Sequence, residues 1–194
     1  MGAQTDFKPV VSVESFKNRM TEESDSLKSI ESRFTQAKYF RLLSEKIIST
    51  GAFSYQKPDK VCLDYQNPVK YRIIINGNKI RMDADGKTNT IDAGSNRVME
   101  QMSALISACM TGNLERLSSD YELTFKENDA LFWIAVVPQG SAKAYMKCID
   151  IFLDKKDFSV RQLKITESSG DYTEYTFTAQ KKNVVFPDAK FAVK

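Results

Sequence analysis

Most strand-like stretches of this chain alternate apolar with polar residues, as strands do when one face meets a core and the other meets solvent. The first such stretch begins at Leu27, and others follow it at 47–57, 60–65, 69–75, 79–83 and 88–92. The pattern resumes at 121–126, 131–137, 144–154, 159–167 and 173–180. Short turns such as Asn76-Gly77 and Asp85-Gly86 join neighbouring stretches, so the pattern predicts antiparallel meanders.

Two segments follow helical spacing instead. Ser12 is a candidate N-cap for a helix that ends near Asp25 and carries Phe16 and Met20 on one face. Residues 95–111 contain no glycine and no proline, and they carry a broad apolar stripe that includes Val98, Met99, Met102, Leu105, Ile106 and Cys109. The order helix, meander, helix, meander predicts an α+β chain that is mainly β, with helices laid on one large antiparallel sheet.

The segment ALFWIAVVP, residues 130–138, does not alternate. A strand that is apolar on both sides needs cover on both faces. We therefore expect a curved sheet whose concave face is covered by the apolar helix and whose convex face is covered by other elements. An antiparallel sheet of about ten strands tends to curl, and the space inside such a part-closed barrel suits an apolar ligand.

Composition and charge exclude several kinds of chemistry. At 194 residues the chain is long enough for one domain with a substantial core, and its net charge of +3 comes from interleaved acids and bases. We therefore expect no nucleic-acid partner. The absence of histidine removes the commonest general base and the commonest metal ligand, so no enzyme, metal site or cofactor is predicted. A histidine-free enzyme or a purely structural domain stays open as an alternative.

The thiols and carboxylates of the chain have simple interpretations. The cysteines are Cys62, Cys109 and Cys148. They lie far apart among apolar neighbours, which favours buried free thiols over one disulfide with a leftover thiol. The sequence DADG at 83–86 favours a hairpin turn over a calcium loop, because further oxygen ligands at loop spacing are missing. For Asp150 and Asp154, solvated strand positions are favoured over a glycosidase pair.

Several short motifs occur in a fixed order along the chain. The segment GAFSYQKPDKVCLDYQNP, residues 51–68, combines a glycine and an aromatic residue, a basic-proline pair, an apolar strand and a second proline. SRFTQ at 32–36 precedes it, and IINGNKI at 74–80, the Met-rich helix at 95–111 and NVVFPDAKFAV at 183–193 follow it. In this order the motifs resemble those of the LolA family of periplasmic lipoprotein carriers.

The resemblance implies a single LolA-like domain over 1–194, with residues 1–11 as an N-terminal tail. Its fold would be an unclosed antiparallel half-barrel of about eleven strands, with a helical lid over an apolar cavity. The residues expected to line the cavity are Phe53, Tyr55, Val61, Leu63, Tyr71, Ile73, Ile75, Met99, Met102, Leu105, Ile106, Phe132 and Ile134. The family typically has an arginine, bonded to the lid, before the first proline. Lys57 stands there in this chain and is the expected lid-gating residue.

The same resemblance implies a periplasmic carrier that binds the acyl chains of lipoproteins and delivers them toward the outer membrane. Its implied partners are acylated lipoproteins, an inner-membrane lipoprotein-releasing transporter and an outer-membrane acceptor, and the carrier is expected to be a monomer. Met1-Gly2 before Ala3-Gln4 would fit a signal peptide that ended near Ala3 and was replaced by a start codon. The alternative is a LolA-like module that binds a different lipid or senses lipoproteins.

Overall fold

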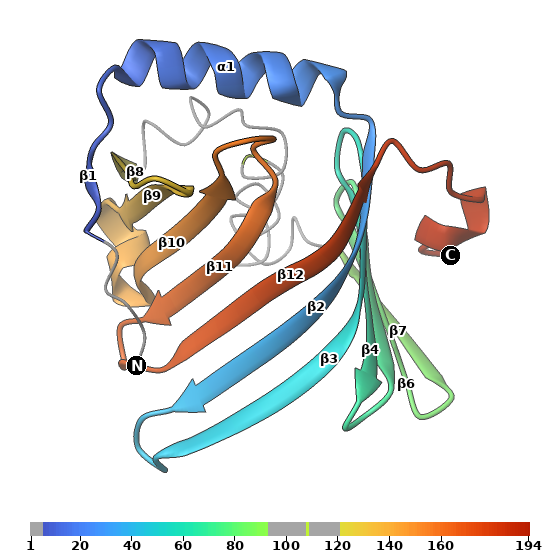
Figure 1. The fold of residues 1–194 in the computed structure, drawn as a ribbon. Coiled ribbons are helices and arrows are strands. Elements are labelled where there is room, and N and C mark those ends of the chain that lie inside the picture. The colour runs from blue at the N-terminus through green and yellow to red at the C-terminus, as the bar shows by residue number, and fades with distance from the viewer. Residues whose placement is uncertain (1–5, 93–107, 109–120) are drawn as a thin grey trace.

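A computed structural model of the chain describes residues 6–92, 108 and 121–194. A 12-stranded antiparallel sheet dominates these residues (Figure 1). Its strands are β1 (Lys8–Pro9), β2 (Ser29–Phe40), β3 (Glu45–Gln56), β4 (Lys60–Asn67), β5 (Tyr71–Asn76), β6 (Lys79–Ala84), β7 (Lys87–Asp92), β8 (Tyr121–Glu127), β9 (Leu131–Pro138), β10 (Met146–Asp154), β11 (Val160–Glu167) and β12 (Tyr172–Lys182). Apart from the single helical residue Ala108, the helical elements among the described residues are α1 (Val13–Ser26) and the short 3-10 helices η3 (Gly140–Ala144) and η4 (Asp188–Phe191).

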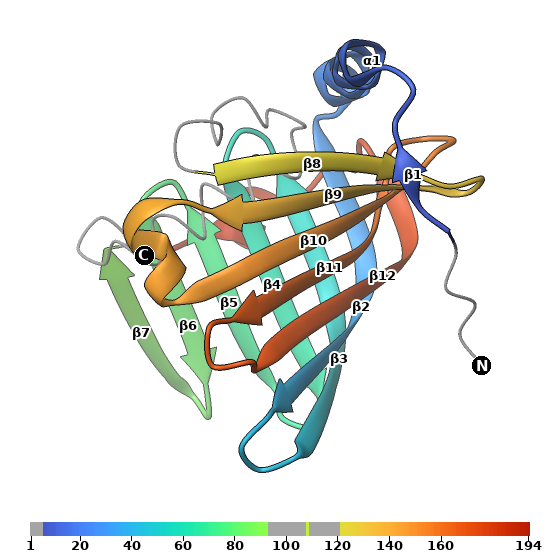
Figure 2. The same ribbon diagram turned by 90° about the vertical axis from the view of Figure 1, so that its left-hand side faces the viewer.

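The strands lie side by side in the order β1-β8-β9-β10-β11-β12-β2-β3-β4-β5-β6-β7. The edge strands β1 and β7 do not pair with each other, so the sheet curves without closing (Figure 2). β12 pairs with β2 and thereby joins the meander β2–β7 to the meander β8–β12. About eleven strands were expected. The additional strand is β1, which is two residues long and lies within the segment expected as an N-terminal tail.

α1 lies across one open end of this half-barrel (Figure 1). The predicted N-cap is confirmed, because the Ser12 hydroxyl accepts a hydrogen bond from the Ser15 backbone N–H at 3.2 Å. Phe16 and Met20 are the buried residues of the helix. The ring of Phe16 packs, at centroid distances of 5.3, 4.8 and 5.8 Å, against the rings of Phe125, Phe132 and Phe158. One face of α1 therefore packs on β8, β9 and the turn after β10.

The sheet buries side chains on both of its faces. The concave face carries the main core, to which β2 to β6 and β8 to β12 all contribute. A second cluster lies on the convex face, where Cys62 and Ile74 pack against Phe191 of η4. Phe186 meets the Phe191 ring edge-on at 5.5 Å, and the Asn76 side-chain amide donates to the Phe191 carbonyl oxygen at 2.9 Å. The C-terminal segment thus covers the outer side of β4 and β5.

The apolar strand β9 is covered fully on one face and partly on the other. Its buried concave residues are Phe132, Ile134, Val136 and Pro138. On the convex face the half-buried Trp133 ring stacks on Phe152 at 5.9 Å and meets the ring of Phe7 edge-on at 5.4 Å. Phe7 comes from the segment that leads into β1, so the expected outer cover of β9 is supplied by the N-terminal residues.

Tight hairpin turns join β5 to β6 and β6 to β7. Asp85 and Gly86 both have positive φ, of 50° and 73°, and form the predicted hairpin turn between β6 and β7. The other predicted hairpin is present, but its two-residue loop is Gly77-Asn78, one residue later than expected. The predicted helix over 95–111 lies outside the described residues except for Ala108, which is helical and buried in the main core.

Gly51 in β3 permits a close approach at the centre of the concave face. A Cβ atom at this position would lie 2.3 Å from the carbonyl oxygen of Asp64 and 2.8 Å from Cζ of Phe34. Phe34 pairs with Gly51 across β2 and β3, and its ring meets the Tyr65 ring edge-on at 5.0 Å. The missing side chain therefore makes room for a buried aromatic ring.

We expect Gly51→Ala to lower the free energy of unfolding by about 2 kcal/mol, because the added methyl group overlaps backbone as well as the Phe34 ring. Urea denaturation measures the change. The control is Thr35→Ala, at an exposed position of β2, which should stay within about 0.5 kcal/mol of the wild type. An unchanged midpoint for Gly51→Ala would contradict the tight packing described here.

Candidate functional site

The concave face of the half-barrel is the candidate functional site. The described residues expected to line a cavity all belong to the main core or pack against it, namely Phe53, Tyr55, Val61, Leu63, Tyr71, Ile73, Ile75, Phe132 and Ile134. The strand register places them in cross-strand rows such as Phe53↔Leu63↔Ile73. The other expected lining residues lie outside the described residues, namely Met99, Met102, Leu105 and Ile106.

The exposure of this face rises toward the β7 edge. In β3, Phe53 and Tyr55 are 3% and 0% exposed. The same rows continue into β6 and β7, where Met82 is 41% exposed and Ile91 is 37% exposed. Ile73, which pairs with Met82, is half-buried. Apolar surface therefore remains open to solvent on the concave side of β6 and β7, and exposed apolar surface of this kind is typical of binding sites.

A cluster of tyrosines occupies the centre of the concave face. The Gln36 side-chain amide donates to the Tyr175 hydroxyl at 2.8 Å, and the hydroxyls of Tyr65 and Tyr175 lie 3.1 Å apart. The Tyr65 ring stacks on the Tyr71 ring at a centroid distance of 4.0 Å. Burial raises the pKa of all three tyrosines, so these phenols stay neutral. The centre of the face thus has polar groups but no charge.

Sequence patterns identified only part of this face. The concave residues that they missed include the aromatic residues Phe34, Tyr65, Tyr175 and Phe177. Alternation from Leu63 puts Tyr65 on the same side of β4, which is a signal that could have found it. Tyr175 has no such local signal, because it joins the cluster through the pairing of β12 with β2.

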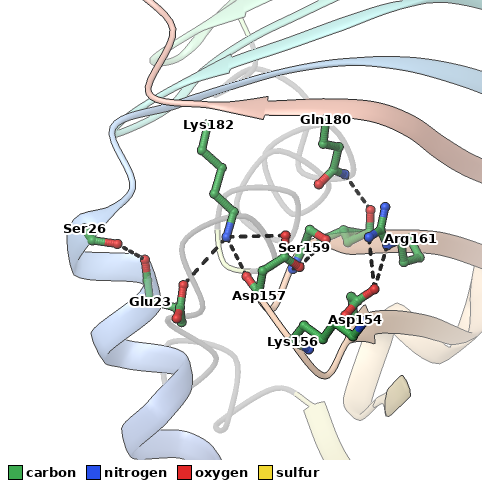
Figure 3. Close-up of polar contacts among 10 residues, drawn as sticks. Glu23, Ser26, Asp154, Lys156, Asp157, Ser159, Arg161, Gln180 and Lys182 are labelled. Atoms are coloured by element: carbon green, nitrogen blue, oxygen red, sulfur yellow. Dashed lines mark hydrogen bonds and ion pairs between the residues drawn. The ribbon is translucent and has the colours of Figure 1, made fainter. Parts of the chain in front are cut away.

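A set of polar contacts holds the C-terminal part of α1 against the sheet (Figure 3). The Lys182 ammonium donates to the carbonyl oxygen of Asp157 at 2.5 Å and lies 3.6 Å from a carboxylate oxygen of Glu23 in α1. Burial raises the pKa of Asp157, but hydrogen bonds from Ser159 outweigh that effect and hold the pKa below its usual value. The pocket beside these groups has a volume of about 40 Å³, which accommodates water rather than an acyl chain.

Lys57 lies in the turn after β3 and also contacts α1. Its ammonium donates to the carbonyl oxygen of Ser24 near the end of the helix, and its backbone N–H donates to the carbonyl oxygen of Lys28 at 2.9 Å. A cation is favourable beside carbonyls at a helix C-terminus. Among the described residues, the helix that Lys57 contacts is therefore α1. The expected lid at 95–111 lies outside the described residues, so the gating role stays a prediction.

The carboxylates considered for catalysis have structural partners on the convex face. Asp150 accepts a hydrogen bond from the Trp133 indole N–H at 2.9 Å. Asp154 forms an ion pair with Arg161 at 2.9 Å. Among the described residues there is no group of three or more side chains that could hold a metal ion. Nothing in these contacts brings two carboxylates together as a catalytic pair.

The described thiols are also structural. Cys62 is buried and Cys148 is half-buried, and both are free. Burial raises the pKa of each thiol, which keeps it in the protonated, unreactive form. Cys109 lies outside the described residues. In the part of the chain that the structure describes, no helix combines the length and the apolar character needed to cross a membrane.

Similarity to known proteins agrees with this architecture. A family model described as "Outer membrane lipoprotein carrier protein LolA" matches residues 25–194. The chain belongs to the LolA family. An outer-membrane lipoprotein carrier protein from Pseudomonas fluorescens (strain Pf0-1) is 21% identical over 174 residues, which cover 89% of this chain and 81% of that protein.

Solved structures share the fold at low sequence identity. An uncharacterized conserved protein from Thermus thermophilus is 7% identical, with a TM-score of 0.55 and 93% of each chain covered. The Pseudomonas aeruginosa MucA/MucB complex gives a TM-score of 0.50 at 14% identity, with 94% of this chain and 62% of that chain covered. The present chain thus spans less than two thirds of the matched chain in that complex.

We expect Lys57→Leu to lower the free energy of local opening of α1 by about 1 kcal/mol, because the Ser24 carbonyl oxygen loses a charged donor. Hydrogen exchange across residues 13–26 should then become about fivefold faster, whereas Lys57→Arg should preserve the wild-type rate. Lys60→Leu, which removes a charge from the adjacent strand, is the control and should leave the rate unchanged. Equal exchange in all of these proteins would show that the Lys57 contact does not hold α1.

Proposed function

We propose that this protein carries lipoproteins by holding their acyl chains against the concave face of the half-barrel. Membership of the LolA family supports a carrier. The observation that carries the proposal is the apolar surface that continues from the buried centre of the face to the exposed side chains of Met82 and Ile91. An acyl chain lying along these rows would cover apolar surface that is otherwise in contact with water.

The energetics of lipid transfer support the need for such a face. Each CH2 group taken from water into an apolar site contributes roughly 0.8 kcal/mol, so a lipoprotein with several acyl chains needs a shield in an aqueous compartment. The tyrosines at the centre of the face are neutral, so an acyl chain bound there does not lie against a charged phenolate. Binding and release need no covalent chemistry, which agrees with the absence of histidine. We infer a binding protein rather than an enzyme.

Under this proposal the protein works in the periplasm. It would receive lipoproteins from an inner-membrane releasing transporter and pass them to an outer-membrane acceptor, as family membership suggests. A carrier must also release its cargo. The half-exposed residues near β7 support reversible binding, because a chain seated there is not fully enclosed by the strands.

The bound ligand can be identified directly. We would purify the protein from its native periplasm, extract it with organic solvent and analyse the extract by mass spectrometry. Triacylated peptides are the expected ligand. Free glycerolipids would instead favour the alternative, a LolA-like module for a different lipid, and protein that never contains lipid would contradict both.

We expect Ile73→Asp to weaken binding of a fluorescent fatty-acid probe by about tenfold or more, because it puts a charge in the middle of an apolar row. Thr178→Asp adds the same charge at an exposed position on the convex side of β12 and should bind the probe normally. Fluorescence titration measures the affinity, and circular dichroism checks that strand content is retained. Normal binding by Ile73→Asp would argue against the concave face as the lipid site.

A further inference from the structure

The hairpin of β2 and β3 ends in two exposed leucines. Leu42 is 95% exposed and Leu43 is 64% exposed, and Ile47 and Ile48 at the start of β3 are 46% and 47% exposed. Neither leucine belongs to a core cluster or packs against one. This hairpin reaches beyond the neighbouring turns at its end of the sheet, as both ribbon views show (Figure 1, Figure 2).

The turn itself does not require leucine. Turn positions of hairpins ordinarily hold polar residues or glycine. Ser44 supplies the left-handed conformation of this turn, with φ of 51°. The Arg41 backbone N–H donates to a carboxylate oxygen of Asp171 in the β11–β12 turn at 2.9 Å, which fixes the start of the turn. Because folding does not account for Leu42 and Leu43, they point to a contact outside the protein.

Aromatic rings and lysines lie just behind the leucines. Tyr39 stacks on Tyr172 of β12 at a centroid distance of 5.1 Å, and the Lys164 ammonium lies 4.5 Å from the centroid of Tyr172. The Lys38 ammonium lies 5.1 Å from the centroid of the Phe40 ring. Tyrosine has an apolar body with a polar end, and lysine has an apolar stem with a charged end. Both residue types are suited to the boundary between an apolar layer and water.

The hairpin tip also carries a small excess of positive charge. The cations near the hairpin tip are Lys38 in β2, Arg41 in the turn and Lys46 in β3, and the carboxylate among them is that of Glu45. Asp171 adds a carboxylate from the neighbouring turn. The excess of positive charge beside exposed apolar side chains complements a surface that is apolar within and anionic outside.

We infer that the tip of this hairpin inserts Leu42 and Leu43 into the surface of an anionic phospholipid bilayer. Ile47 and Ile48 are successive strand residues, so they point to opposite sides of the hairpin, and both are exposed. A bilayer meets an inserted tip on every side, whereas a partner protein would meet one side of it. Two leucines bury too little surface for permanent anchoring, so the contact is brief and reversible. The inference goes beyond the carrier function and does not depend on it.

Vesicle flotation with the full chain and no lipoprotein tests this inference. Vesicles of phosphatidylethanolamine and phosphatidylglycerol should carry the wild-type protein, and raised salt or pure phosphatidylcholine should reduce the bound fraction. The double variant Leu42→Asn, Leu43→Asn should bind at least about tenfold less. Val69→Asn is the matched control, because Val69 is a 56% exposed valine in the β4–β5 turn at the same end of the sheet. It should float as the wild type does.

Each outcome of the flotation experiment bears on the inference. Both leucines are exposed, so the double variant should keep the wild-type unfolding midpoint, which denaturation checks. Equal flotation of the wild type and the double variant would overturn the inference, as would a wild type that never floats. A wild-type dimer that is lost in the double variant, without flotation, would assign the tip to a second copy of the chain and also overturn it.

The variant Ile73→Asp separates this inference from the proposed carrier function. Its substitution lies on the concave face, away from the hairpin tip, so it should float as the wild type does. Loss of flotation in Ile73→Asp, together with normal flotation of the double leucine variant, would place the lipid contact on the concave face and overturn the inference. Failure of Ile73→Asp to affect probe binding would bear only on the carrier function.

Discussion

The pairing of β12 with β2 is the interaction on which the rest of the structure depends. It joins two meanders that are each continuous in sequence, and without it no single concave face would exist. The same junction positions α1. Asn183, directly after β12, accepts a hydrogen bond from the Lys28 backbone N–H at 2.7 Å and donates to the Ser26 carbonyl oxygen at 3.2 Å. The end of the helix is therefore attached where the two meanders meet.

An unclosed sheet leaves its concave face incompletely buried. At the centre the packing is dense, since Phe34 lies over Gly51 and is 2% exposed. Toward β7 the apolar side chains become exposed, as Met82 shows. This gradient accounts for a site that combines a rigid centre with open apolar surface, and a transient ligand can occupy such a surface without rearrangement of the strands. The convex face is covered differently, by the N-terminal residues over β9 and by η4 over β4 and β5.

Local patterns were sufficient for α1 and for the strands other than β1, because alternation and an N-cap depend on neighbouring residues. They also placed Phe53 and Tyr55 on the face where the structure has them. They could not identify partners that are distant in sequence. The hydroxyls of Tyr65 and Tyr175 meet across 110 positions of the chain, and the Lys57 ammonium donates to the Ser24 carbonyl oxygen in α1, 33 positions away. Which segment covers a face is decided by the whole fold, and no window of sequence contains that information.

The central claim is that acyl chains lie on the concave face, and site-specific photo-crosslinking tests it most directly. A photoreactive amino acid is placed at Leu63, half-buried on the concave side of β4, and in a second protein at Thr35, exposed on the convex side of β2. Each protein is produced in a periplasm that contains lipoproteins and is then irradiated. We expect lipoprotein adducts from position 63 and none from position 35. Adducts from position 35 alone, or equally from both positions, would contradict it.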